Sequence, residues 1–167
     1  MRFATSALAL VASAAAASAA SISFWTLDKL TRTIHFTPNA GLPNIKSVTV
    51  NNKRRTKVVF PPDWVGNFYA VQEGHDNIPG MLGEVAFSSR DHKTYFDVSG
   101  IVNADDVNNV KQIWPASGAP PMSGCEVFPC SNAYWLPDDV QTKVTSELDL
   151  IATLGTGSTG MNFVESD

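Results

Sequence analysis

Short segments in which apolar and polar residues alternate recur along most of the chain. β-Branched and aromatic residues dominate these segments, as is typical of strands that bury one face. Proline and glycine punctuate them, as turns between strands require. The segments lie at residues 22–27, 33–37, 47–51, 57–60, 68–71, 84–87 and 94–99. Because no convincing amphipathic helix separates them, the pattern predicts an all-β domain built as a sandwich or barrel.

The chain beyond residue 100 is less regular. We expect, in chain order, a short helix at 107–114, a Pro/Gly/Ser-rich loop at 116–129, a further helical turn at 138–143 and a closing strand at 149–154. Residues 156–167 contain a Gly/Ser/Thr-rich run and predict a flexible C-terminal tail. The β domain is therefore expected to span residues 21–155.

The first twenty residues have the composition of a secretory signal peptide. Arg2 supplies a positive charge, residues 4–20 are small and apolar, and Ala17, Ser18 and Ala19 form a small-x-small cleavage pattern. A membrane-spanning helix needs about 20 strongly apolar residues, whereas this stretch is short and rich in alanine and serine. We therefore predict cleavage after Ala19 or Ala20, secretion to the extracellular space, and no membrane anchor.

The charge balance argues against nucleic-acid binding. Without Arg2 the chain has 11 lysine and arginine residues against 16 aspartate and glutamate residues, a net charge of −5, whereas nucleic-acid binders usually present a basic face. The one basic cluster is Lys53, Arg54 and Arg55 with Lys57 alongside. Its position between two predicted strands favours a solvated hairpin turn over a polyanion site.

The two cysteines, Cys125 and Cys130, lie five positions apart. In an exported protein this spacing predicts a disulfide that closes a small loop. A metal site would need further cysteine or histidine ligands at short spacing, and the three histidines are scattered. We therefore expect neither a metal nor any other cofactor.

Carboxylates are the candidates for chemistry, because no nucleophile motif or phosphate-binding glycine loop occurs. Glycoside hydrolysis uses two carboxyl groups across the sugar bond, one of them with a raised pKa. Glu84 and Asp97 lie on adjacent predicted strands, and antiparallel pairing would put both on one face. The alternative is that both belong to a solvated rim of the sheet.

Several segments resemble a known family. Residues 94–99 (TYFDVS), followed by Ile101, Val102 and Asn103, resemble the segment aromatic-Tyr-Asp-Val/Ile-Ser-Leu-Val-Asp of thaumatin-like proteins. In that family a glutamate stands thirteen positions before the aspartate, as Glu84 stands before Asp97. Residues 60–69 (FPPDWVGNFY), 78–85 (IPGMLGEV) and 123–142 resemble a smaller fungal branch of secreted members. The resemblance extends from about residue 23 to residue 155.

This resemblance implies a thaumatin-like β-sandwich that acts at the fungal cell wall, by glucan binding or wall remodelling during conidial germination. It implies β-glucan as partner and a binding cleft formed by Glu84, Asp97, Asn103, Asp105, Asp106, Tyr69 and Tyr95. The chain departs from the family pattern where Asn103 replaces an aspartate, where the cleft arginine has no counterpart, and where only two cysteines remain.

Three functions stay open at this point. The first is a non-catalytic glucan binder, in which Trp64, Phe68, Tyr69 and Tyr95 either stack on sugars or fill the core. The second is an endo-β-1,3-glucanase with Glu84 as general acid and Asp97 as its partner, against which Asn103 argues. The third is a secreted adhesin or effector that contacts a host-surface protein.

Overall fold

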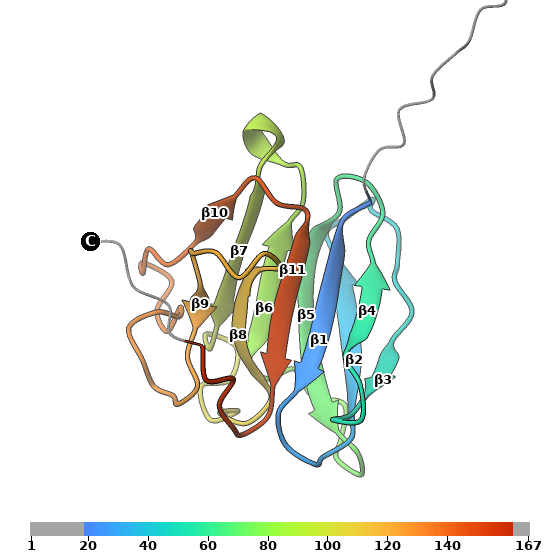
Figure 1. The fold of residues 1–167 in the computed structure, drawn as a ribbon, viewed down its shortest axis with the longest axis vertical. Helices are drawn as coiled ribbons and strands as arrows, with labels where there is room; N and C mark the ends of the chain where they lie inside the picture. The colour runs from blue at the N-terminus through green and yellow to red at the C-terminus, as the bar shows by residue number, and fades with distance from the viewer. Residues whose placement is uncertain (1–18, 162–167) are drawn as a thin grey trace, which may run out of the picture.

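The computed structural model describes residues 19–161 and shows two β-sheets packed face to face (Figure 1). One sheet has the strand order β4 (Thr56–Val59), β1 (Ser21–Thr26), β11 (Asp149–Leu154), β8 (Val110–Pro115) and β9 (Ser123–Gly124). The other has the order β10 (Lys143–Thr145), β7 (Thr94–Ser99), β6 (Leu82–Ala86), β5 (Val65–Gln72), β2 (Arg32–Pro38) and β3 (Val48–Val50). The predicted all-β sandwich is therefore confirmed.

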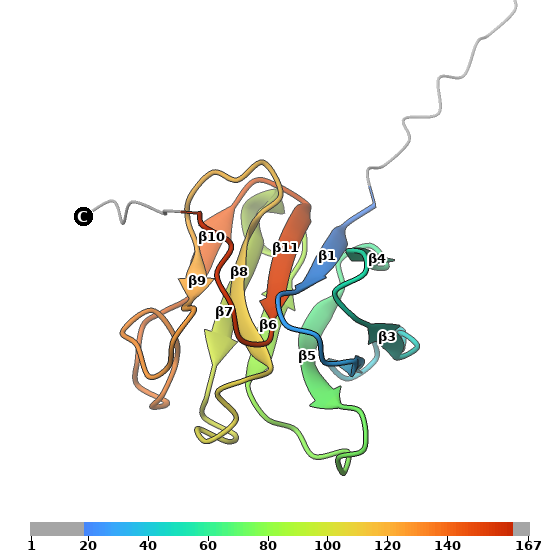
Figure 2. The same cartoon turned by 60° about the horizontal axis from the view of Figure 1, so that its bottom comes forward.

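The first and last strands lie side by side at the centre of the five-stranded sheet. β1 pairs with β11 in parallel, and the other strand pairs are antiparallel. Figure 2 shows the two strands next to each other, with β8 on the other side of β11. The predicted signal peptide lies mostly outside the described residues, but Ala20 is 5% exposed and its carbonyl accepts a hydrogen bond from the Phe60 N–H at 2.9 Å.

An aromatic cluster fills the space between the sheets. The rings of Phe24 and Phe68 meet edge to face at 5.1 Å, and those of Phe60 and Trp64 at 5.0 Å. Trp64 and Phe68 are fully buried, so these two aromatics belong to the core and offer no face to a sugar. Gly83 lies opposite Phe68 on β6, and a Cβ at this position would collide with the Phe68 ring.

Two expected helices are wrong. Residues 110–115 form β8, whose six residues are all buried. The only helical element among residues 19–161 is a 3₁₀ turn, η1 (Arg90–His92), and residues 138–142 form a loop that leads into β10. The expected closing strand at 149–154 is present as β11.

The segment that follows β11 lies against the domain. Its Thr156 N–H donates to Asp28 Oδ2 at 3.0 Å, and its Thr159 N–H donates to Glu126 Oε1 at 2.9 Å. The part of the predicted tail that the structure describes, residues 156–161, is thus held by hydrogen bonds. No helix within residues 19–161 is long and apolar enough to cross a membrane.

A buried ion pair connects the end of β1 with the beginning of β2. Arg32 is fully buried, and its guanidinium donates to both carboxylate oxygens of Asp28 at 2.7 Å. It also donates to Asn109 Oδ1 at 2.9 Å and to the Asn108 carbonyl at 3.0 Å. Hydrogen bonds, chiefly that from Arg32, hold the pKa of Asp28 below its ordinary value despite burial.

Candidate functional site

The outer face of the six-stranded sheet carries a row of polar side chains. Strand register places Asp97 opposite Glu84, Glu84 opposite Asn67, and Asn67 opposite Thr37. Their neighbours along each strand, such as Phe96, Val85 and Phe68, are buried in the core. Because side chains alternate between the faces of a strand, all four polar residues point away from the core. We call Thr37, Asn67, Glu84 and Asp97 the polar row.

Glu84 and Asp97 form a carboxyl pair within this row. Their side chains are close enough to share a hydrogen bond, as directly opposed residues on paired strands generally are. Glu84 is half-buried, whereas Asp97 is 8% exposed. The Thr142 hydroxyl, from the loop before β10, donates to Asp97 Oδ2 at 3.3 Å. Asp97 Oδ1 is buried and, within the described part of the chain, has no backbone or hydroxyl donor.

The carboxyl pair holds a proton more tightly than isolated acids do. Burial raises the pKa of Asp97 from its ordinary value of 3.8 to about 7, and the negative charge of Glu84 and the hydrogen bond between the two carboxyl groups add to the shift. The hydrogen bond from Thr142 acts in the opposite direction. No lysine, arginine or histidine of the described residues lines the surrounding hollow, so no cation favours the doubly ionised state.

The hollow around the carboxyl pair is small and mostly polar. It has a volume of about 170 Å³, and its polar lining comes from Asn39, Asn67, Glu84, Tyr95, Asp97 and Thr142. Asn39, Asn67 and Thr142 escaped the sequence analysis. Asn67 could have been found, because it stands two residues before Tyr69 on an alternating strand. Thr142 comes from a distant loop and left no local signal.

Two aromatic groups flank the polar row. Tyr95 stands two residues before Asp97 on β7, is half-buried and lines the hollow. Tyr69 lies outside the lining of this hollow; it stacks on His35 with ring centroids 5.2 Å apart, and its hydroxyl donates to Asn77 Oδ1 at 3.1 Å. His35 and Tyr69 are paired two positions along the strands from Thr37 and Asn67, on the same face of the sheet.

The remaining predicted cleft residues lie elsewhere. Asn103, Asp105 and Asp106 line a separate hollow of about 450 Å³ beyond the ends of β5 and β7. Asp106 accepts hydrogen bonds from the Met81 N–H at 2.9 Å and from Asn109 Nδ2 at 2.6 Å, and burial raises its pKa. The structure thus divides the expected single cleft into two hollows, because the chain turns away from the sheet after Ser99.

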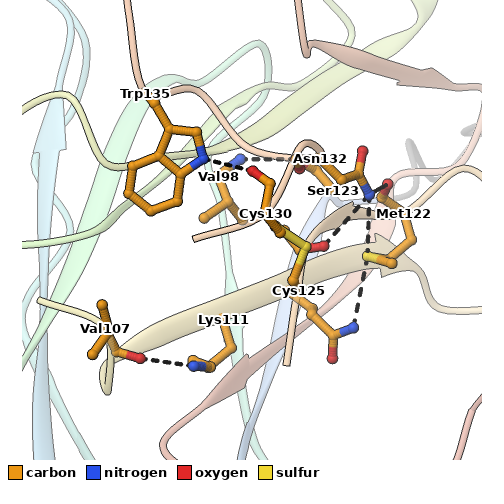
Figure 3. Close-up of a disulfide and its surroundings, with 11 residues drawn as sticks. Val98, Val107, Lys111, Met122, Ser123, Cys125, Cys130, Asn132 and Trp135 are labelled. Atoms are coloured by element: carbon orange, nitrogen blue, oxygen red, sulfur yellow. Dashed lines mark hydrogen bonds between the residues drawn. A yellow bond between two sulfur atoms is a disulfide. The ribbon is translucent and has the colours of Figure 1, made fainter. Parts of the chain in front are cut away.

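The predicted disulfide between Cys125 and Cys130 is confirmed. It closes a loop beside β8 and β9 (Figure 3), where Trp135 Nε1 donates to the Cys130 carbonyl at 2.6 Å. The loop places Phe128 over Lys111, whose Nζ lies 4.6 Å from the ring centroid and donates to the Val107 carbonyl at 2.7 Å. Burial lowers the pKa of Lys111. No group of three or more histidine, cysteine, aspartate or glutamate side chains within residues 19–161 is arranged to hold a metal ion.

A solved structure of similar fold is, by its title, that of a protein elicitor. The crystal structure of the protein elicitor MoHrip2 from Magnaporthe oryzae superposes with a TM-score of 0.64 over 83% of this chain and 100% of that chain, at 16% sequence identity. At this identity the likeness concerns the fold alone. No protein-family model matches the chain.

A curated relative identifies the family. The antigenic protein SchS21 of Stachybotrys chartarum is 59% identical over 144 residues, which cover 86% of this chain and 100% of that protein. The expected membership of the thaumatin-like family is therefore wrong: short motifs such as residues 94–99 suggested it, but neither the relative nor the structural neighbour is a thaumatin-like protein by its description. The role in conidial germination was implied by that resemblance alone. The chain belongs to the family of the antigenic protein SchS21.

Proposed function

We propose that this protein is secreted and binds a neutral β-glucan along the polar row without hydrolysing it. The observation that carries the proposal is the carboxyl pair of Glu84 and Asp97, which is in register, partly buried and without a neutralising cation. Secretion is supported by the signal-like composition of residues 1–20 and by the disulfide.

The polar row offers hydrogen-bonding groups suited to sugar hydroxyls. Asn67, Glu84 and Asp97 stand opposite one another on successive strands, which lie about 4.8 Å apart, so their polar groups form a line across the sheet. A carboxyl pair that shares one proton offers one hydrogen-bond donor and several acceptor oxygens. A sugar hydroxyl can both donate and accept, so it can bind to either kind of group. Tyr95 adds an aromatic side chain at the edge of this line.

The spacing of the two acids argues against hydrolysis. Retaining glycosidases place their carboxyl groups about 5 Å apart and inverting enzymes still farther, so that a sugar carbon or a water molecule fits between them. The hydrogen bond between Glu84 and Asp97 that contributes to the raised pKa of Asp97 places the two carboxyl groups closer together than either arrangement. The raised pKa of Asp97 is thus a consequence of burial and of its partner, without the separation that glycoside hydrolysis requires.

The test measures binding and turnover in one preparation. We expect the purified protein to co-sediment with insoluble β-1,3-glucan and to release no reducing sugar. Replacing Glu84 with Gln should weaken binding by about 1–3 kcal/mol, because a hydrogen bond to a charged group is lost. Asp105→Asn, at an exposed acid of the other hollow, is the matched control and should bind as wild type. Hydrolysis that disappears in Glu84→Gln would instead establish a glucanase.

A second candidate function rests on the relatives. One is named an antigenic protein and the structural neighbour is titled a protein elicitor, so we also propose that the secreted protein is recognised at a host surface. Purified protein applied to host tissue should then trigger a response that survives Glu84→Gln. A response that is lost together with glucan binding would make recognition a consequence of the polar row.

A further inference from the structure

A second surface of the molecule concentrates positive charge. Lys53, Arg54, Arg55 and Lys57, which we call the basic hairpin, contribute four of the 11 basic residues that follow Arg2. All four are exposed. The turn connects β3 with β4, the edge strands of the two sheets, and so lies at one edge of the sandwich (Figure 1).

Most cations of the basic hairpin have no counterion within the described part of the protein. Among the described residues the ion pairs are Asp28 with Arg32 and Asp149 with Lys57. The second pair is exposed, with Lys57 Nζ 3.3 Å from Asp149 Oδ1, and exposed pairs contribute little. Lys53, Arg54 and Arg55 therefore have no carboxylate partner in the described structure. The rest of the chain is acidic, but at physiological salt charges beyond about 8 Å are largely screened.

An aromatic ring fixes one of these cations in place. Arg55 Cζ lies 3.9 Å from the ring centroid of Trp25 on β1, and both residues lie on the outer face of the five-stranded sheet. A guanidinium held over an indole keeps its N–H groups available for a planar acid, and less conformational entropy is lost when the acid binds. Lys57 follows on the same face of β4, opposite Ser23.

The sequence alone favours a solvated turn here, but from the contact of Arg55 with Trp25 and the cations without a carboxylate partner we propose that the basic hairpin binds a carboxylated polysaccharide, a chain of sugar acids. Carboxylates match the fork of the arginine guanidinium, and a flexible chain can contact a narrow strip of cations without approaching the acidic remainder of the surface. This site is separate from the polar row, which lies on the outer face of the other sheet. A test of polysaccharide binding at the basic hairpin can therefore succeed or fail independently of the neutral glucan proposed to bind at the polar row.

The experiment uses the full mature protein and polygalacturonate as the probe. We expect binding at low salt whose affinity falls steeply as salt rises, because cations displace counterions from a polyanion. The double variant Arg54→Ala/Arg55→Ala should lose at least tenfold in affinity and show a shallower salt dependence. Arg90→Ala/Lys93→Ala is the matched control: it removes the same charge from another exposed turn and should stay within about twofold of wild type.

A third variant separates the contribution of the Trp25 ring to polygalacturonate binding from the contribution of charge. Trp25→Leu keeps every cation but removes the ring under Arg55, and we expect a severalfold loss with an unchanged salt dependence. Thermal unfolding of each variant checks that the domain remains folded. The proposal is overturned if both double variants weaken binding equally, if polygalacturonate does not bind at low salt, or if anionic phospholipid vesicles or DNA bind as tightly through the same residues.

Discussion

Asp97 is expected to make the domain less stable as pH rises toward neutrality. Burial and the adjacent Glu84 raise its pKa from 3.8 to about 7, so the folded state holds a proton that the unfolded chain releases near pH 4. Stability therefore falls as pH rises between about 4 and 7. A shift of this size corresponds to about 4 kcal/mol, since each pKa unit is worth about 1.4 kcal/mol.

The substitution Asp97→Asn isolates this effect. The amide resembles the protonated carboxyl group and carries no charge, so the cost of the buried charge disappears at about pH 8. A hydrogen bond worth about 1 kcal/mol is disturbed in exchange. We therefore expect the variant to be more stable than wild type by about 2–3 kcal/mol at pH 8 and to be about equal or slightly less stable near pH 4.

The measurement is urea unfolding of wild type and Asp97→Asn at a series of pH values, with the disulfide intact. The difference between the two proteins matters, because other acids contribute to each curve. Hydrogen bonds, chiefly that from Ser21, lower the pKa of Asp149, for example, and this adds a stability term that is lost as pH falls. Asp105→Asn controls for removing one exposed carboxyl group. A difference between wild type and Asp97→Asn that stays constant from pH 4 to pH 8 would refute the reasoning.

Three further predictions concern the scaffold. Arg32→Met should lower the free energy of unfolding by about 3–5 kcal/mol in urea titrations, because Asp28 keeps a partly buried charge without its partner. Replacing both Cys125 and Cys130 with serine should cost about 2 kcal/mol, as expected for a short loop, while circular dichroism shows an unchanged sheet content. N-terminal sequencing of the secreted protein should begin at Ala20, since that residue is buried in the sandwich and a cut behind it would remove a core contact.

The alternation of apolar and polar residues predicted the half-buried strands well, but it did not predict the fully buried strand β8. β1 and β2 show clear alternation of buried and more exposed positions. β8 is buried on both faces at all six positions, so its sequence has no period of two and was interpreted as a short helix. Lys111 and Gln112 within β8 are buried as well, although polar residues seldom are.

The sequence predicted only the part of the candidate site that pairing between consecutive strands brings together. The turn between β6 and β7 is short, so the sequence alone brings Glu84 and Asp97 to the same region. It does not show that Asn103, Asp105 and Asp106 lie in another hollow, because their position depends on how the loop after β7 packs against Gly80 and Met81. The contribution of Thr142 depends on a segment 45 residues away from Asp97, which no local pattern encodes.

The carboxyl pair is itself an argument that the outer face of the six-stranded sheet has a function. A buried acid with a raised pKa lowers stability at neutral pH, and the surrounding residues give it no compensating cation. Neighbouring outer positions on the same strands hold Val65 and Ala86, so apolar residues fit this surface without that cost. Natural sequences depart from locally favourable choices chiefly where a site needs them. Glu84 and Asp97 fulfil this description, whereas Asp28 and Arg32, which neutralise one another, are explained by the fold alone.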